Sequence, residues 1–236
     1  TNDKGQPKAG GDIYIGRDRD TNVLAAIGDA SGANLESKLG FVETSGQFLA
    51  TYGTRVTAKD WLLDPINITI AGSGPTGSPY GDNDGVTAGV QFNPSTGSTI
   101  LASDIAANLN AGTNVTVSTG LAGSPGTDDG NITVSSAIVK SGASNAALTL
   151  DANNRVIVNA RIGRASNDST STGNLNVTIL ARGNAQTAAQ GSAHIANVID
   201  AVAGTVDITG TSLSGWEGVI FQGASGITAG TYTVRG

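Results

Sequence analysis

A short strand-like pattern recurs along the second half of this chain, and it restricts the fold more than any other feature. Each copy holds two or three alternating apolar residues separated by Thr, Ser or Asn, with Gly or Asn on its flanks. The copies lie at residues 112–118, 130–135, 147–151, 156–159, 173–179 and 204–209. One such strand has too little apolar surface to be stable alone, whereas stacked copies form a continuous core. The pattern therefore predicts an all-β fold, a parallel β-solenoid with extruded loops.

The alternation also predicts which side chains form the core. The pairs expected to point inward and to stack from coil to coil are Val115/Val117, Ile132/Val134, Leu148/Leu150 and Val206/Ile208. With Leu175 included, the first apolar positions of successive strands are 16 to 31 residues apart. At roughly 20 residues per coil and ~4.8 Å between coils, the chain would form about a dozen coils and a rod of about 50–60 Å.

Composition agrees with a narrow stack and excludes several partners. Gly accounts for 34 residues, Pro for 6, and aromatic residues for only 4%, so the core must come from Val, Ile, Leu and Ala. Trp61 is expected to fill the core or a loop-covered edge. The net charge is −6 with 13 scattered Lys and Arg, which argues against nucleic acid as a partner. No apolar stretch approaches the ~18 residues of a membrane span, so membrane insertion of this segment is not expected.

The first half of the chain is less regular, but we expect residues 1–236 to form one continuous β-helical segment. Residues 71–98 are rich in Gly and Pro and predict a loop insertion that leaves the stack. Residues 103–109 would fit a short helix with Asp104 as its cap, although Ile105, Ala107 and Leu109 also alternate as in a strand. Cys is absent and the chain starts at Thr1, which suggest an interior piece of a large exported bacterial protein.

Asparagines precede several of the strands. Asn114, Asn131 and Asn174 each stand one residue before a strand, which predicts a ladder of stacked amides. Asn-X-Ser/Thr sequons begin at Asn67, Asn114, Asn131, Asn167 and Asn176. They are either glycosylation sites or simply strands entered from a turn, and we favour the second interpretation.

No motif predicts a catalytic, cofactor-binding or metal-binding residue. Asp18-Arg-Asp-Thr-Asn22 resembles the start of a calcium loop but lacks the later Gly and Glu. Asp82-Asn-Asp84 and Asp128-Asp129 are read as solvated turns, and His194 as an exposed or packing residue. The only small basic cluster in the sequence is formed by Arg155, Arg161 and Arg164.

Two stretches resemble a known family. Gly40-Phe-Val-Glu-Thr-Ser-Gly46, followed by Trp61-Leu-Leu-Asp-Pro-Ile-Asn-Ile-Thr-Ile70, resembles a signature of secreted adhesins of the filamentous haemagglutinin type, biofilm matrix adhesins included. Residues 109–119, 123–126 and 130–134 resemble the sequence pattern usual in that family, so the resemblance covers residues 10–180. It implies a right-handed parallel β-helix, two-partner secretion through an outer-membrane transporter, and structural roles for residues 61–65.

The sequence and the resemblance together predict a non-enzymatic structural shaft of a secreted bacterial adhesin that mediates cell–cell or cell–matrix attachment in biofilms. Its expected partners are exopolysaccharide or cell-surface glycans, and its expected location is the bacterial cell surface. One alternative is a carbohydrate-active β-helix enzyme, a polysaccharide lyase or a depolymerase similar to phage tailspikes. The other is a glycan-binding surface without catalysis.

Overall fold

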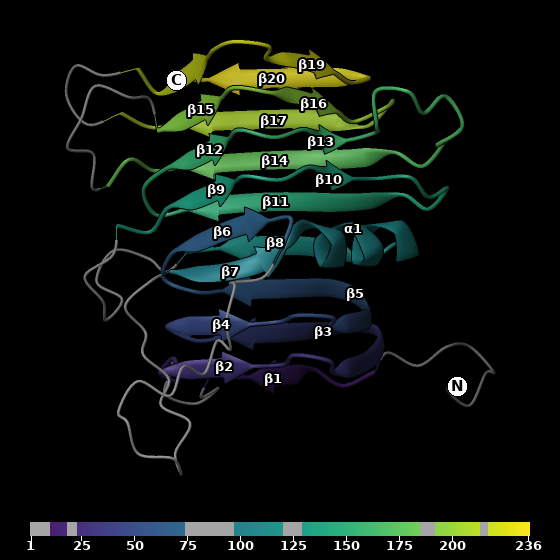
Figure 1. Cartoon of the computed structure of the whole chain (residues 1–236), viewed down its shortest axis with the longest axis vertical. Helices are drawn as coiled ribbons and strands as arrows, with labels where there is room; N and C mark the ends of the chain where they lie inside the picture. The colour runs from purple at the N-terminus through teal and green to yellow at the C-terminus, as the bar shows by residue number, and fades with distance from the viewer. Residues whose placement is uncertain (1–9, 18–22, 74–96, 120–128, 185–191, 213–216) are drawn as a thin grey trace.

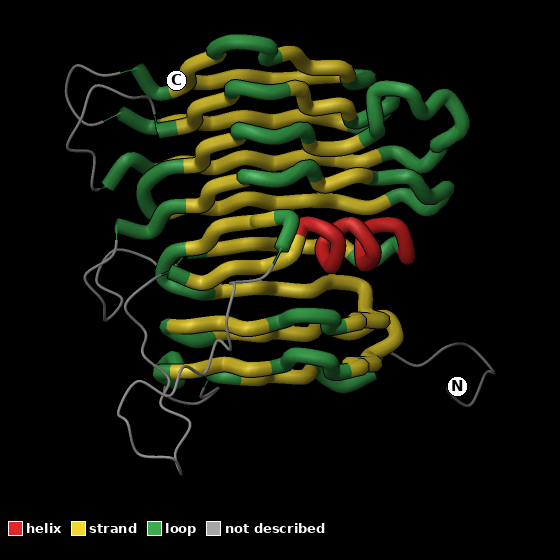
Figure 2. The backbone as a smooth tube through the Cα atoms, in the orientation of Figure 1, coloured by secondary structure: helices red, strands yellow, loops and turns green. Residues whose placement is uncertain are grey.

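The computed structural model describes residues 10–17, 23–73, 97–119, 129–184, 192–212 and 217–236. In these ranges the chain forms a stack of coils built from twenty strands and one helix (Figures 1 and 2). The strands are β1 (Ile13–Ile15), β2 (Ile27–Asp29), β3 (Asn34–Ser45), β4 (Phe48–Ala50), β5 (Arg55–Asp64), β6 (Ile68–Ala71), β7 (Ser98–Leu101), β8 (Asn114–Ser118), β9 (Ile132–Val134), β10 (Ile138–Val139), β11 (Ala146–Ala152), β12 (Val156–Val158), β13 (Ile162–Gly163), β14 (Leu175–Ala181), β15 (Ala193–Ile195), β16 (Val198–Asp200), β17 (Thr205–Gly210), β18 (Val219–Phe221), β19 (Gly226–Thr228) and β20 (Thr231–Arg235). The helix is α1 (Ala102–Ala111).

Parallel sheets form the faces of the stack. The long face has eight strands in the order β1-β3-β5-β8-β11-β14-β17-β20. The second face has the order β18-β15-β12-β9-β6-β7, and the third face has the order β10-β13-β16-β19. A separate pair joins β2 to β4. All pairings between these strands are parallel, so the predicted all-β, parallel, solenoid-like architecture is confirmed.

The coils are longer and fewer than the sequence predicted. On the long face, Val115 pairs with Leu148, Leu148 with Val177, and Val177 with Val206, which in turn pairs with Tyr232. From β8 onward one coil therefore takes 26 to 33 residues, whereas the step from β3 to β5, from Val42 to Trp61, is 19 residues, close to the predicted 20. Eight strands with ~4.8 Å spacings give a stack of roughly 34 Å, so the predicted dozen coils and 50–60 Å rod are wrong.

The error arose because strands of two faces were read as one series. Ile132 does not stack on Val115; it lies on the second face, where it pairs with Ile68 and Val156. Leu175 pairs with Ala146 and is not the counterpart of Leu148. The period-2 alternation is the same on every face, and the sequence pattern alone does not separate them.

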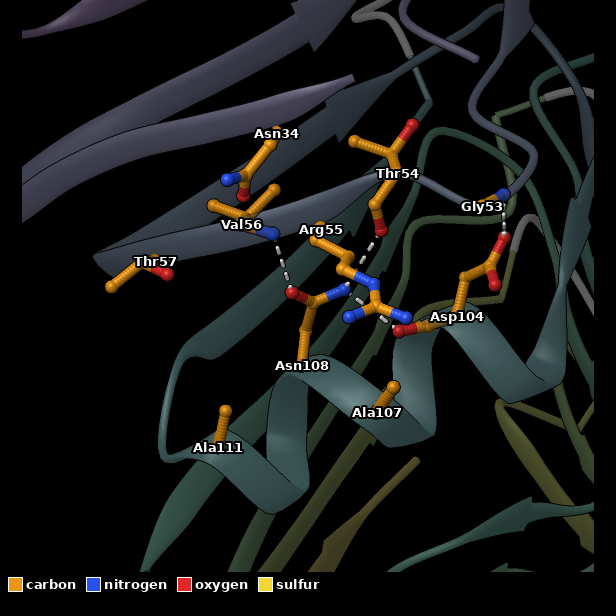
Figure 3. A pocket seen from close by; sticks show the side chains of 10 residues that line it. All are labelled: Asn34, Gly53, Thr54, Arg55, Val56, Thr57, Asp104, Ala107, Asn108 and Ala111. Atoms are coloured by element: carbon orange, nitrogen blue, oxygen red, sulfur yellow. Dashed lines mark hydrogen bonds between the residues drawn. The ribbon is translucent and has the colours of Figure 1, made fainter. Parts of the chain in front are cut away.

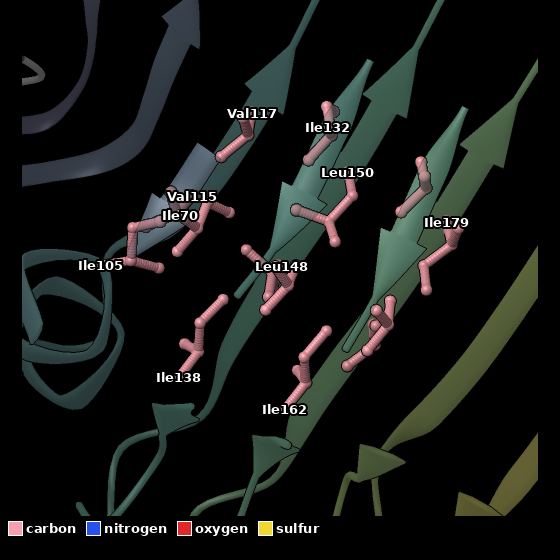
Figure 4. Close-up of a cluster of buried hydrophobic side chains, with 14 of the residues drawn as sticks. Ile70, Ile105, Val115, Val117, Ile132, Ile138, Leu148, Leu150, Ile162 and Ile179 are labelled. Atoms are coloured by element: carbon pink, nitrogen blue, oxygen red, sulfur yellow. The ribbon is translucent and has the colours of Figure 1, made fainter. Parts of the chain in front are cut away.

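The predicted inward direction of the alternating residues is confirmed. All eight of the predicted inward residues are buried with at most 1% of their surface exposed. The core of the middle coils consists of closely stacked Val, Ile and Leu side chains (Figure 4). Trp61 is also in this core, 1% exposed, and its Nε1–H donates to Thr44 Oγ1 at 3.1 Å. The prediction that Trp61 fills the interior is therefore confirmed.

The segment for which helix and strand both remained open is helical. Ile105 and Leu109 of α1 are fully buried, and the helix ends at Gly112, which has a φ of 92°. Gly suits this left-handed conformation because it has no Cβ. The prediction that Asp104 caps the helix is wrong. The N-cap position is Leu101, and Asp104 lies in the first turn, where its Oδ2 accepts the Gly53 N–H at 2.8 Å.

The predicted insertion at 71–98 is too wide at both ends. Ala71 is the last residue of β6 and Ser98 the first of β7, while residues 74–96 lie outside the described part of the chain. β7 pairs in parallel with β6, and Ser98 is level with Ile68. Gly72 and Ser98 are thus at opposite ends of the pair, roughly 13 Å apart along the strands. A deletion that joined Gly72 directly to Ser98 would therefore strain both strands.

The single asparagine ladder is also wrong. Asn114 Oδ1 accepts the Ala147 N–H at 2.9 Å, and Asn131 Oδ1 accepts from Asn154 Nδ2 at 3.0 Å. Asn174 instead donates its backbone N–H to Asn145 Oδ1 at 2.9 Å. Each asparagine joins two neighbouring coils, but the three lie in different columns.

Candidate binding cleft beside the helix

Helix α1 stands where a strand would otherwise continue the stack. It lies between the first half of β5 and β10 (Figure 1). The Val56 N–H, which points to this side, donates to Asn108 Oδ1 at 2.8 Å. Thr113 Oγ1 lies 3.2 Å from the Val56 carbonyl oxygen and 3.1 Å from that of Ala58. Asn108 of the helix and Thr113 just after it therefore satisfy the backbone hydrogen-bonding groups at this edge of β5.

The opposite side of the helix is bound to the next coil through Asn110. Its Oδ1 accepts the Ser141 N–H at 2.9 Å and the Gly142 N–H at 3.1 Å. Two asparagines of one helix thus replace part of the backbone bonding that a strand would supply in both directions.

A cleft of about 650 Å³ opens between this helix and β5 (Figure 3). It is lined by Asn34, Gly53, Thr54, Arg55, Val56, Thr57, Asp104, Ala107, Asn108 and Ala111. Asn108 and Thr54 are buried in its floor, whereas Arg55 and Thr57 are exposed on the β5 wall. Ala107 and Ala111 are small, exposed residues on the helix wall, and they leave the space open.

The cleft has one cationic and one anionic side chain. Burial raises the pKa of Asp104 above its usual range, and the hydrogen bond from the Gly53 N–H acts in the opposite direction. The backbone N–H of Arg55 donates to the Ala33 carbonyl oxygen, but its side chain has no hydrogen bond or ion pair within the described part of the chain. The cleft can therefore offer a guanidinium group to an anion and a carboxylate oxygen to a hydroxyl group.

A second polar cluster is buried inside the first coils. Arg17 Nη1 lies 2.9 Å from Glu43 Oε1 and 3.7 Å from Asp64 Oδ2, and Ser45 Oγ donates to Glu43 Oε1 at 2.6 Å. Glu43 is 3% exposed and Asp64 8%. Burial raises the pKa of Asp64 to about 6, while Arg17 opposes this shift and Glu43 adds to it. Because both carboxylates are buried and Arg17 neutralises them in part, we assign the cluster a structural role.

The basic cluster seen in the sequence is divided in the structure. Arg161 and Arg164 both approach Asp200 Oδ2, at 3.7 and 3.4 Å. Arg155 precedes β12, at a different corner of the coil. Lys140 is fully buried, its Nζ donates to the Gly142 carbonyl oxygen at 3.0 Å, and burial lowers its pKa. None of these residues lines the cleft.

The other sequence motifs lie at several different places in the structure. Residues 18–22, 82–84 and 128 lie outside the described part of the chain, whereas Asp129 is exposed. His194 lies on the second face and hydrogen bonds to Gln222 through Nε2 at 2.8 Å. Of the sequon asparagines, Asn67, Asn114, Asn131 and Asn176 each accept a hydrogen bond from a neighbouring coil, which supports their structural interpretation. In the described ranges, no three His, Cys, Asp or Glu side chains gather closely enough to hold a metal ion.

Sequence reasoning missed the cleft. Asp104 was noticed only as a helix cap, and Asn34, Arg55 and Thr57 were not singled out. Arg55 and Asp104 are far apart in sequence, and they meet only because the chain returns through β7 before α1. No local pattern indicates such a return.

Comparison with known proteins adds no assignment. The sequence matches no model of a protein family, and no curated protein matches it. In the described part of the chain, the one helix is too short to cross a membrane.

Proposed function

We propose that this chain is a segment of the rigid shaft of a large secreted bacterial adhesin of the filamentous haemagglutinin type. In this proposal the coils form a right-handed parallel β-helix, an outer-membrane transporter exports the protein, and it acts at the cell surface. The shaft holds a binding region away from the cell or joins cells to exopolysaccharide matrix. Its work is mechanical, and no catalytic step is assigned to it.

The observation that carries the proposal is the long face. One parallel sheet runs without interruption from β1 to β20, so backbone hydrogen bonds connect every successive strand along the axis. Beneath it, inward Val, Ile and Leu residues stack in the same column from coil to coil. Such a one-dimensional stack can be lengthened by whole coils without a change in its cross-section, which is what a spacer requires.

The buried carboxylates do not support the enzyme alternative. Glu43 and Asp64 are enclosed with Arg17, and a polysaccharide chain cannot reach them in this conformation. Glycosidases need their carboxyl groups on both sides of a scissile bond. The glycan-binding alternative is favoured by the cleft beside α1.

Removal of one coil in register tests the shaft. Ala147 pairs with Asn176, so deletion of residues 147–175 joins equivalent positions of adjacent coils. Cells that display the full-length protein with this deletion should adhere as well as the parent cells. A matched deletion of residues 147–160 breaks register and should abolish folding. Loss of adhesion in the in-register variant, with secretion intact, would show that this coil carries the binding function itself; turnover of a polysaccharide by the isolated chain would favour the enzyme.

A further inference from the structure

Arg55 differs from the other described arginines in having no partner. Arg17, Arg161, Arg164, Arg182 and Arg235 each form an ion pair with Asp or Glu, and Arg155 also interacts with a neighbour. The Arg55 side chain has no ion pair or hydrogen bond in the described part of the chain, although the protein carries an excess of acidic residues. Arg55 is exposed and lies in the wall of the cleft beside α1.

The groups around Arg55 are hydrogen-bonding groups that remain available. Asn34 is level with Arg55 on the neighbouring strand, and Thr57 lies two residues further along the same face of β5. Both are exposed. Asp104 uses Oδ2 for the Gly53 N–H, which leaves Oδ1 as an acceptor. The cleft therefore combines one site for an anion with several sites for hydroxyl groups.

The size and the charge of the cleft restrict its ligand. A volume of about 650 Å³ lies within the range of small-molecule sites, about 300–1,000 Å³. One guanidinium fork matches one carboxylate in a bidentate pair. A phosphate or a sulfate cluster carries more charge, which Asp104 and the net charge of −6 would repel. A neutral sugar would leave Arg55 unused, while Ala107 and Ala111 can contact the apolar edge of a pyranose ring.

We propose that the cleft between α1 and β5 binds a uronic acid residue of an acidic polysaccharide, with the sugar carboxylate on Arg55 and the ring hydroxyls on Asp104, Asn34 and Thr57. The proposal adds a ligand site to the molecule and does not depend on the shaft function. It holds equally for a spacer that carries a matrix contact along its side and for a glycan-binding protein.

Isothermal titration calorimetry of the intact chain with trigalacturonate, a neutral trisaccharide and inorganic phosphate tests the proposal. Trigalacturonate should bind, and its affinity should fall as salt is raised. Arg55→Gln should weaken binding about ten- to a hundredfold, and Arg55→Lys should retain part of the affinity because it keeps the charge but loses the fork. Ala107→Leu should weaken binding by filling the cleft. The matched control, Arg235→Gln, removes an exposed arginine of the last strand and should bind like the parent.

Several results would overturn the proposal. Equal affinity for the neutral trisaccharide would remove the role of the carboxylate, and equal affinity for phosphate would reduce the cleft to a general anion site. Binding of trigalacturonate that survives Arg55→Gln and Ala107→Leu would place the site elsewhere. Absence of binding at millimolar trigalacturonate would also refute it. Circular dichroism melts of each variant separate loss of binding from loss of folding, since Arg55 and Ala107 are both exposed.

Discussion

The coils from β8 to β19 and the junction at α1 hold one stack together by different means. In the coils, strands on three faces pair with the strands above and below. At the junction, the backbone pairing continues on the long face, where β5 pairs with β8. It also continues on the second face, where β6 pairs with β9, whereas side chains provide the connections beside α1 and between β7 and β4: Asn108 Oδ1 accepts the Val56 N–H, and Ser98 Oγ accepts the Leu49 N–H at 2.9 Å. Among the described strands, β4 pairs with β2 and not with β7.

This difference teaches that a solenoid can accept a helix where side-chain amides replace the missing ladder. Asn is suited to this because one amide group offers both an acceptor and a donor, as the peptide group does. The replacement satisfies the strand edge but supplies fewer hydrogen bonds per coil than a strand. We therefore expect the regular coils to be uniformly stable and the junction to open first. The place where the helix replaces a strand is also the place of the cleft that we assign to a ligand.

The largest effect is expected from a charge placed inside a regular coil. Ile132→Asp puts a carboxylate at a fully buried position and should lower the free energy of unfolding by at least about 4 kcal/mol, or prevent folding. Thr133→Asp, on the outward side of the same strand, should cost less than about 1 kcal/mol. Chemical denaturation measures both. Equal losses would show that the two faces of β9 are assigned the wrong way round.

Removal of the buried Trp61 side chain should affect mainly the coils before the junction. Trp61→Ala leaves a large cavity and removes the donor to the Thr44 hydroxyl, and we expect a loss of about 3–5 kcal/mol. Hydrogen exchange should show lost protection in β3 and β5 before β14 and β17. Trp61→Phe, which keeps most of the volume, serves as the control. A uniform loss of protection through all coils would mean that the junction does not separate two units.

The junction itself is tested by a pair of asparagine variants. Asn108→Ala leaves the buried Val56 N–H without an acceptor, which should cost about 1–3 kcal/mol and increase hydrogen exchange at Val56. Asn145→Ala removes a comparable inter-coil bond, the one to the Asn174 N–H, at an exposed position of the regular coils. There water can replace the lost acceptor, so about 0.5–1 kcal/mol is expected. A larger loss for Asn145→Ala would contradict the view that the helix carries the junction.

These contrasts also show what the sequence could predict. Alternation of two residues identifies the inward side chains because burial on a strand follows that period directly, as Val115 and Ile132 show. It does not say which strands share a face, since strands of all faces look alike locally. The coil length was therefore underestimated. The cleft depends on the return of the chain through β7, a long-range feature set by how the elements pack.

The smallest effect concerns the buried carboxylate in the first coils, and its sign is distinctive. The pKa of Asp64 is raised from 3.8 to about 6 in the folded state, so between these values the folded protein holds a proton that the unfolded chain has lost. This residue therefore favours folding most at acidic pH, and its contribution falls as pH rises through 4 to 6. Asp64→Asn cannot ionise. We expect it to stabilise the protein by about 1–3 kcal/mol at pH 8 and to make little difference at pH 4.

Asp168 provides a control of opposite sign for this last prediction. Hydrogen bonds from Ser171 and Thr170 hold the pKa of Asp168 below its usual range, so its contribution is present at neutral pH and is lost on acidification below about 4. Asp168→Asn should therefore weaken the protein at pH 8 and approach the parent at low pH. Thermal melts of the three proteins between pH 3 and 8 show both trends. If Asp64→Asn were destabilising at pH 8, the attraction between Asp64 and Arg17 would outweigh the burial of the carboxylate, and the first coils would depend on that ion pair.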